Sequence, residues 1–291
     1  MMRVGVVVNP TSEESVLNQV RQGLEMRAAE IVWEETSEGD PGVGQARALV
    51  ERGVDIVLAV GGDGTVRACV EGLADTDVSL GVIPLGTGNL LARNLDIPLD
   101  IDEAIEVALT GRSEVLDAGV INGEVFTVIA GTGFDAAIME STESEMKSRI
   151  GSLAYVIEGI RHIADAPISA EIEIDGAEAV KGKWATILIG NLGRLQGGVD
   201  LFPDAFSRDG RLDMLALSAE TTMEALAAGF AAVTHNDDHS QIFRAAGKSF
   251  RIQLDRPAPY EMDGEPRPDS TSLEVEVAPD RLNVRVPRSD R

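Results

Sequence analysis

Short apolar runs alternate with amphipathic segments through the first third of the chain. The apolar runs cover residues 4–8 (VGVVV), 54–60 (VDIVLAV) and 79–83 (SLGVI), and a weaker run covers 31–33. Continuous apolar runs of this length are typical of strands that are buried on both faces, as in a parallel sheet. We therefore predict four strands of a parallel sheet in this part of the chain.

The segments between these strands have helical periodicity. A helix over 13–28 would follow Ser12, a residue type that often caps helix N-termini. A second helix over 43–52 would end before Gly53, and glycine is common just after a helix. In segment 65–73 the apolar residues fall on one helical face. Strands and helices in alternation predict a doubly wound α/β domain.

The pattern changes after about residue 117. Apolar and polar residues then alternate with a period of two in four segments, at 168–174, 250–254, 273–277 and 282–286. This period is typical of antiparallel strands with one buried face. Helical patterns interrupt the alternation at 144–164 and 221–233. We expect an α/β domain over 1–117 and an antiparallel, β-sandwich-like domain over 118–291, with a last strand at 281–287 packing back on the first domain.

Length and composition add limits to this picture. A chain of 291 residues suits two modest domains. The single cysteine, Cys69, excludes an intramolecular disulfide, and no apolar run approaches the roughly 18 residues of a transmembrane helix. The N-terminus runs straight into a strand-like segment without the features of a signal peptide. We expect a cytoplasmic protein.

The formal net charge is −24, and lysine occurs at only four positions. Such a chain is a poor candidate for non-specific nucleic-acid binding, which depends on many Lys and Arg contacts to phosphates. Its average field also repels nucleotides and anionic membranes. Any phosphate site must therefore depend on backbone amides, a metal ion and a few arginines.

The sequence GGDGT at 61–65 follows a predicted strand and opens a predicted helix. Glycines let the backbone turn sharply and approach a phosphate, while a helix start offers N–H groups and a partial positive charge. Asp63 would repel a bare phosphate, so we expect it to act through magnesium or water. The alternative is a tight turn that binds nothing.

A second glycine segment, PLGTGNLLAR at 84–93, follows the next strand. Thr87 can donate a hydroxyl to a phosphate, Asn89 can cap the following helix or bind a ligand, and Arg93 lies one turn into that helix. Two such loops at the carboxyl ends of neighbouring strands define a ligand crevice.

Together these two segments resemble the diacylglycerol kinase catalytic family, which includes sphingosine kinases and bacterial lipid kinases. The resemblance implies a phosphotransferase that uses ATP and Mg²⁺ and a lipid alcohol, with the nucleotide between the domains. The chain departs from the family where no glycine follows the sequence NPTS at 9–12 and where Gln45 replaces a common histidine. The implied nucleotide contacts are Asn9, Thr11, Thr36, Gly61, Gly62, Asp63, Gly64, Thr65, Val66, Arg67, Gly86, Thr87 and Asn89.

The resemblance continues into the second domain. The sequence GTGFD at 131–135 follows a predicted strand over 125–130 and resembles a family glycine turn, with a plain β-turn as the alternative. The family match makes Asp209 a magnesium ligand, helped by the backbone carbonyls of Phe206 and Arg211. One carboxylate with carbonyls and waters is a reasonable set for Mg²⁺. The alternative is an Asp–Gly turn before a strand at 211–217.

Asp263, Gly264 and Glu265 lie between two β segments. The resemblance makes Glu265 the proton acceptor for the attacking hydroxyl, with Asp263 ordering metal-bound water, or the two roles exchanged. A carboxylate suits this role because it can take the proton as the new bond forms. Without the family context, these three residues would form an ordinary surface turn.

These expectations lead to an ATP-dependent lipid kinase that acts on diacylglycerol or a related lipid. Contact with the membrane surface would be peripheral, and a homodimer is left open. NAD kinases are the alternative enzyme, because they share the GGDGT loop, although they generally lack the second segment in this form. A non-catalytic sensor of nucleotides or lipids is the alternative from another class.

Overall fold

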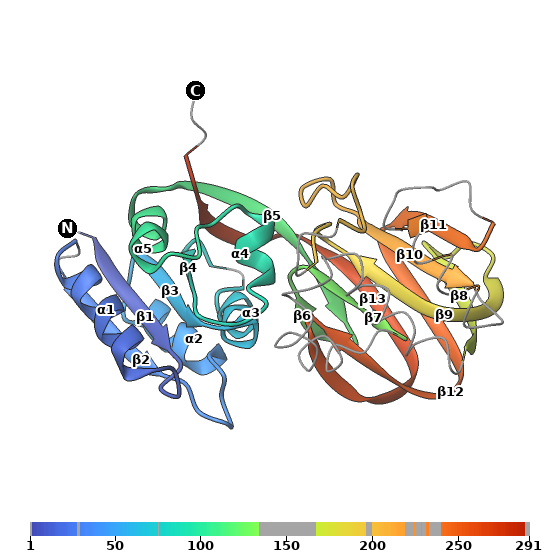
Figure 1. Cartoon of the computed structure of the whole chain (residues 1–291), viewed down its shortest axis with the longest axis horizontal. Coiled ribbons are helices and arrows are strands. Elements are labelled where there is room, and N and C mark those ends of the chain that lie inside the picture. Colours follow the sequence, from blue (N-terminus) through green and yellow to red (C-terminus); the bar gives the residue numbers. More distant parts are fainter. Residues whose placement is uncertain are drawn as a thin grey trace, which may run out of the picture. The chain divides into compact units, whose positions relative to one another are not determined.

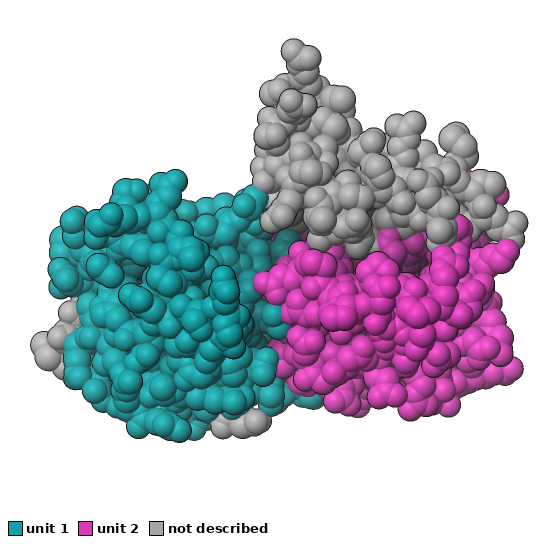
Figure 2. All heavy atoms as spheres, turned by 90° about the horizontal axis from the view of Figure 1, so that it is seen from below, with its two compact units in different colours: residues 1–118, 279–291 teal, residues 119–278 magenta. Residues whose placement is uncertain are grey.

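The computed structural model forms two compact units, Met1–Ala118 with Pro279–Arg291, and Gly119–Ala278 (Figure 2). We call them unit 1 and unit 2. The structure describes residues 2–27, 30–74, 76–133, 167–195, 200–218, 224, 228, 231–232 and 240–288. The predicted helix at 144–164 lies outside these ranges, as does most of the predicted helix at 221–233.

Unit 1 contains the parallel sheet that the apolar runs predict. Its strands are β1 (Arg3–Val8), β2 (Glu30–Glu35), β3 (Ile56–Gly61) and β4 (Ser79–Pro84), joined by the end of β13 (Glu265–Val286). Their order is β13-β4-β3-β1-β2, and each neighbouring pair is parallel. All residues of β3 and β4 are buried, because helices cover both faces of the sheet.

The helices of unit 1 are α1 (Glu14–Glu25), α2 (Val43–Glu51), α3 (Asp63–Gly72), α4 (Leu90–Asn94) and α5 (Ile101–Thr110) (Figure 1). A Cβ added to Gly5 of β1 would lie 3.0 Å from Leu49 of α2. A Cβ added to Gly81 of β4 would lie 2.8 Å from Ala108 of α5. The strand register puts Gly5 and Gly81 on opposite faces of the sheet. The predicted doubly wound α/β domain is therefore confirmed.

The predicted boundaries of α1 were wrong at both ends. Glu13, rather than Ser12, is the N-cap residue, and no side chain caps this helix. The Ser12 N–H instead donates to the Asn9 carbonyl at 3.2 Å, which holds Ser12 in the preceding turn. The helix ends at Glu25, with Met26 as its C-cap.

Unit 2 is antiparallel throughout its described strand pairs. Its strands are the end of β5 (Arg112–Ile121), β6 (Glu124–Phe126), β7 (Ile129–Thr132), β8 (Ile168–Ile174), β9 (Val180–Gly190), β10 (Leu212–Ser218), β11 (Ile242–Gly247), β12 (Ser249–Met262) and the first part of β13. Both β7 and β8 pair with β9 on one side and β12 on the other. The predicted β-rich second domain is confirmed.

Apolar and polar residues alternate in β12, and they are buried and exposed in turn, as a period of two predicts. Phe250, Ile252 and Leu254 are buried in the core of unit 2 between exposed residues. A continuous strand expected at 125–130 is, however, broken: β6 ends at Phe126, and β7 starts at Ile129. The two residues between them, Thr127 and Val128, donate their N–H groups elsewhere, as described below.

Among the residues that the structure describes, no helix is both long enough and apolar enough to cross a membrane.

Candidate active site

Three of the predicted nucleotide contacts follow adjacent strands of unit 1. Asn9 comes directly after β1, Thr36 comes directly after β2, and Gly61 ends β3. Because these strands are parallel and in register at their ends, the three residues lie along one edge of the sheet. Asn9 Oδ1 accepts hydrogen bonds from the N–H and the hydroxyl of Thr11, at 3.0 and 2.8 Å. These two bonds form a compact turn beside the glycine loop.

The sequence GGDGT forms the transition from β3 to α3. Gly62 is the N-cap residue of α3, and no side chain caps the helix there. An N-terminus of this kind presents backbone N–H groups and a partial positive charge to an anion. The side chains of Thr65, Val66 and Arg67 are buried. Phosphate binding at this loop would therefore depend on the backbone.

The two glycine loops of unit 1 touch each other. A Cβ added to Gly86 would lie 2.7 Å from the Cα of Gly62, and a Cβ added to Gly88 would lie 2.7 Å from Oδ2 of Asp63. Real Cβ atoms do not approach a backbone atom this closely, so the contact between the loops requires glycine at 86. At 88 a larger residue would displace the Asp63 side chain. The two loops thus form one surface.

Asp63 joins the loops through its carboxylate. Its Oδ1 accepts a hydrogen bond of 2.7 Å from the N–H of Leu90, the first residue of α4. Asp63 thus supplies the oxygen that a capping residue usually provides to α4. The structure gives Asp63 a local role in holding the second loop, while its action through magnesium or water stays a prediction.

Asn89 precedes α4, but its side chain does not cap the helix. Its Oδ1 accepts from the Gly86 N–H at 2.9 Å, and its Nδ2 donates to the Gly86 carbonyl at 2.7 Å. Asn89 also has a left-handed φ of 48°. Its buried side chain closes the turn, while Thr87 at the tip is exposed. Arg93 Nε donates to the Gly88 carbonyl at 2.8 Å, which fixes the turn from the helix side.

In unit 2, Asp263 and Gly264 form a two-residue turn between β12 and β13. Met262 pairs with Glu265 across the turn, and the φ angles of Asp263 and Gly264 are 49° and 82°. Positive φ at both central residues is the requirement of a type I′ hairpin turn, and Asp–Gly is a preferred pair for it. Glu265 is therefore the first residue after a sharply defined turn.

The Asp263 carboxylate is buried and accepts four hydrogen bonds. Oδ2 accepts from the Thr127 N–H at 2.7 Å and the Thr127 hydroxyl at 2.9 Å, and Oδ1 accepts from the N–H groups of Val128 at 2.8 Å and Ile129 at 3.0 Å. These bonds explain the break between β6 and β7. Burial raises the pKa of Asp263 above its ordinary value, while the donors from Thr127, Val128 and Ile129 act in the opposite direction.

Glu265 has a partly exposed side chain that pairs with an arginine. Arg267 Nη2 lies 3.3 Å from Glu265 Oε2, and Arg267 Nε lies 3.2 Å from Glu124 Oε2. Only 13% of the Arg267 side chain is exposed, against 38% for Glu265. The predicted proton acceptor is thus accessible and held by a nearly buried cation.

The predicted magnesium ligands lie in a compact turn before β10. The Phe206 carbonyl accepts from the N–H groups of Arg208 at 2.6 Å and Asp209 at 3.2 Å, and Asp209 Oδ1 accepts from the Arg211 N–H at 3.0 Å. Within the described part of the chain, no group of three His, Cys, Asp or Glu side chains is placed to hold a metal ion. A magnesium ion here would need one carboxylate, carbonyl oxygens and water, which is a set that Mg²⁺ accepts.

Charged side chains of both signs gather around this turn. Burial raises the pKa of Asp213 above its ordinary value, and the carboxylates of Asp209 and Asp204 raise it further, while Arg211 and Arg244 oppose them. Neighbouring carboxylates repel each other unless a proton or a cation lies between them. In this turn, Arg211 and Arg244 offset part of that repulsion.

Comparison with known proteins gives the same family from both units. Residues 3–121 match the model of the diacylglycerol kinase catalytic domain, and residues 128–286 match that of the YegS C-terminal NAD kinase β-sandwich-like domain. The diacylglycerol kinase of Bacillus subtilis (strain 168) is 31% identical over 275 residues, which cover 91% of this chain and 90% of that protein. A protein of Yersinia pestis (strain Pestoides F), named "Probable lipid kinase YegS-like", is 30% identical over 96% of this chain and 93% of its own length.

The chain belongs to the diacylglycerol kinase family of lipid kinases. Kinases of this family use ATP. Solved structures agree with the fold of this lipid kinase. A diacylglycerol kinase from Bacillus anthracis str. Sterne superimposes with a TM-score of 0.75 at 24% identity, covering 98% of this chain and 96% of that one. An NAD kinase from Archaeoglobus fulgidus superimposes with a TM-score of 0.52 at 11% identity, covering 97% of this chain and 92% of that one.

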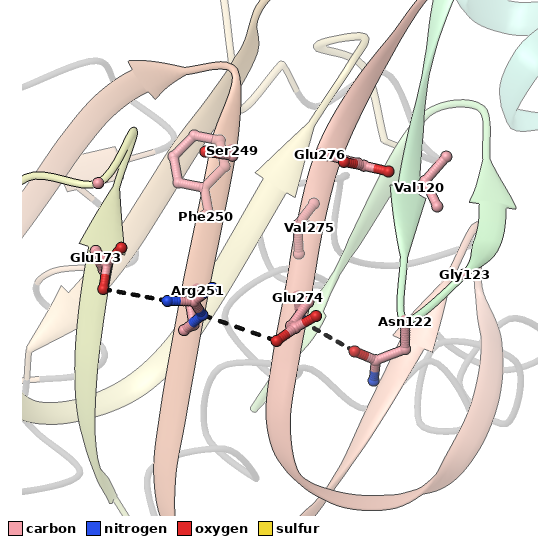
Figure 3. A pocket seen from close by; sticks show the side chains of 11 residues that line it. Val120, Asn122, Gly123, Glu173, Ser249, Phe250, Arg251, Glu274, Val275 and Glu276 are labelled. Carbon is pink, nitrogen blue, oxygen red and sulfur yellow. Dashed lines mark hydrogen bonds and ion pairs between the residues drawn. The ribbon is translucent and has the colours of Figure 1, made fainter.

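A shallow hollow of about 270 Å³ lies elsewhere on unit 2 of the kinase. Arg251 of β12 lies there between Glu173 of β8, at 3.6 Å, and Glu274 of β13, at 3.7 Å (Figure 3). Asn122 Oδ1 accepts from the Glu274 N–H at 2.9 Å. None of the predicted site residues lines this hollow. Its charged side chains form a cross-strand row, which is a common way to stabilise an exposed sheet face.

Sequence reasoning missed Arg267, Glu124 and Thr127. The signal for Arg267 was available, because residues two apart in a strand share a face and Arg267 follows Glu265 by two. The partners of Asp263 and Arg267 in β6 and β7 depend on pairings more than a hundred residues apart, and no local pattern indicates them. In the GTGFD segment, an added Cβ on Gly131 or Gly133 would clash with the backbone of β9. Phe134 and Asp135 lie outside the described residues.

Proposed function

We propose that this lipid kinase transfers the γ-phosphate of ATP to a hydroxyl of diacylglycerol or a closely related lipid. The observation that carries the proposal is the hairpin turn at Asp263 and Gly264, which presents the accessible carboxylate of Glu265 from a rigid support. The named activity of the Bacillus subtilis relative favours diacylglycerol as the acceptor class.

The two glycine loops of unit 1 are assigned to the phosphates of ATP. Backbone N–H groups at the start of α3 and in the turn at 86–89 provide the donors, since the chain has few lysines. Asp63 holds the loops together by its bond to Leu90. Thr87 is exposed at the tip of the second loop and supplies a hydroxyl. Asn9, Thr11 and Thr36 belong to the nucleotide site because they share the same sheet edge.

Glu265 is assigned as the proton acceptor. A lipid alcohol has a very high pKa, so it does not ionise before it attacks, and the carboxylate takes the proton late as the bond to phosphorus forms. Asp263 suits this role less well, because its oxygens already accept four hydrogen bonds. We assign Asp263 instead to holding the turn from which Glu265 projects.

Magnesium fits the turn before β10. Asp209 and the carbonyl oxygens of Phe206 and Arg211 would hold it, and the bound ion would supply positive charge that offsets the charge of neighbouring carboxylates and phosphates.

The kinase is proposed to be cytoplasmic and to contact the membrane peripherally, because its acceptor is a lipid. The net charge of −24 disfavours attraction to anionic lipid, so apolar side chains would carry most of the contact. Phe206, with 61% of its surface exposed, is an apolar side chain suited to such contact. The homodimer stays a prediction.

The experiment offers γ-labelled ATP with diacylglycerol, a sphingoid base or NAD in separate reactions. Labelled lipid supports the proposal, labelled NAD without labelled lipid would replace it with an NAD kinase, and tight ATP binding without any product would favour a sensor. Glu265→Gln should lower kcat about 10²–10⁴-fold with ATP affinity unchanged. Glu276→Gln, an exposed carboxylate on the same strand, is the matched control and should keep wild-type activity.

A further inference from the structure

Arg267 makes three hydrogen bonds with three different guanidinium nitrogens. Nε donates to Glu124 Oε2 at 3.2 Å, Nη1 donates to the Pro266 carbonyl at 3.1 Å, and Nη2 donates to Glu265 Oε2 at 3.3 Å. The guanidinium plane is therefore fixed from three directions. A planar, always charged group held in this way is a rigid point of reference for a neighbouring carboxylate.

The backbone explains why these groups meet. Glu265 and Arg267 are two residues apart in β13, so their side chains leave the same face of the strand. Their partners across the ladder are Met262 and Tyr260 of β12. The turn at Asp263 is held by bonds to the segment between β6 and β7, and Glu124 belongs to β6. The turn and the guanidinium are thus anchored on the same neighbouring segment.

We propose that Arg267 is a positioning residue for Glu265: it orients the carboxylate for proton transfer. This inference rests on the proposed function, in which Glu265 is the proton acceptor. A glutamate side chain has three rotatable bonds, and holding it in one geometry costs conformational entropy. The bond from Nη2 restricts those rotations before substrate arrives, which favours catalysis because reacting groups need correct orientation.

A second arginine of unit 2 shows what an ordinary surface arrangement looks like. Arg251 also lies between two glutamates, Glu173 and Glu274, but at 3.6 and 3.7 Å and with 61% of its side chain exposed (Figure 3). The Arg267 side chain is only 13% exposed, and its contacts are shorter. Arg251 therefore serves as a matched control, with the same residue type, the same sheet and the same kind of partners.

The test compares Arg267→Met, Arg267→Lys and Arg251→Met in the full-length kinase with the lipid acceptor. Arg267→Met should lower kcat about 10–100-fold with the KM for ATP unchanged. Arg267→Lys should recover part of the loss, since lysine restores the charge but not the planar fork. Arg251→Met should keep wild-type kcat. Glu265 and Glu124 are 38% and 46% exposed, so water can solvate both carboxylates and Arg267→Met should fold.

A double-mutant cycle separates positioning from general damage. If Arg267 acts through Glu265, adding Arg267→Met to Glu265→Gln leaves the residual rate unchanged. If the two losses multiply instead, or if Arg267→Met alone keeps wild-type kcat, the inference is overturned while the proposed function stands. A wild-type kinase that labels no lipid, or a fully active Glu265→Gln variant, would overturn the proposed function or its base, and this inference with it.

Discussion

Asp263 and Thr127 are joined by two hydrogen bonds to a single carboxylate oxygen, from the Thr127 N–H at 2.7 Å and from its hydroxyl at 2.9 Å. The other oxygen accepts two further backbone N–H groups, from Val128 and Ile129. Four donors around one buried carboxylate stabilise the ends of β6 and β7 and the turn before β13 at the same time. Within the Asp–Gly–Glu motif, Asp263 thus has a structural function, while the catalytic function is proposed for Glu265.

The first prediction follows from this arrangement. In Asp263→Asn, an amide NH₂ group replaces one acceptor and faces N–H donors, so buried donors lose their partner. We expect the free energy of unfolding to fall by about 2–4 kcal/mol, measured by urea denaturation. Asp269→Asn, an exposed residue of β13, is the control and should unfold like wild type. Equal stability of Asp263→Asn and wild type would mean that the four bonds contribute little.

The second prediction concerns the contact between the glycine loops. In Gly86→Ala the new Cβ would meet the Cα of Gly62 at 2.7 Å, so the loops must move apart. We expect kcat/KM for ATP to fall by about tenfold or more, because small misplacement of binding groups is costly. Gly39→Ala, where an added Cβ meets nothing within 4 Å, should have wild-type kinetics. An unchanged kcat/KM in Gly86→Ala would remove this loop from the nucleotide site.

The third prediction tests the proposed magnesium turn. Asp209→Asn keeps an oxygen that can accept the Arg211 N–H but removes a negative charge, and Mg²⁺ prefers carboxylate. The magnesium concentration needed for half-maximal rate should rise about tenfold or more, while the rate at saturating magnesium recovers. Asp269→Asn should leave the magnesium dependence unchanged. A wild-type magnesium titration for Asp209→Asn would place the ion elsewhere.

The fold was predictable where pattern alone decides the structure. The apolar runs at 4–8, 54–60 and 79–83 became buried parallel strands, because each has helices on both faces. The alternation in 250–254 became a half-buried strand. The pattern failed at 125–130, where it indicates one strand, because the N–H groups of two residues there bind a distant carboxylate instead of a sheet partner.

The site was predictable as motifs but not as contacts. Local sequence located the turn at Asn89, but the oxygen that caps α4 belongs to Asp63. Its Oδ1 accepts the N–H of Leu90, which lies 27 residues later in the chain. The pairing of Arg267 with Glu124 spans 143 residues. Side-chain partners at such separations depend on how strands are brought together, which residue types alone do not determine.

The last prediction concerns Asp175, the one carboxyl group among the described residues whose pKa is lowered. Asp175 Oδ1 accepts the N–H groups of Ser249 at 2.9 Å and Lys248 at 2.8 Å, and the bond from Ser249 is the largest cause of a pKa below the ordinary value. Asparagine at 175 can keep both bonds through its own oxygen and tolerates the φ of 51°. Asp175→Asn therefore removes the charge and little else.

The folded state favours the charged form of the Asp175 carboxylate. Asp175 therefore stabilises the protein fully when the pH is above the pKa of an aspartate in the unfolded chain, which is about 4. This stabilisation is lost as the pH falls through the lower pKa of Asp175 in the folded state. Wild type should thus unfold at a higher temperature than Asp175→Asn at neutral pH, and the two midpoints should converge below about pH 4. Thermal unfolding between about pH 3 and pH 7 measures this, with Asp255→Asn, an exposed residue of β12, as the charge-matched control. A difference that stays constant over the whole range would show that asparagine disturbs the geometry of the turn rather than its charge.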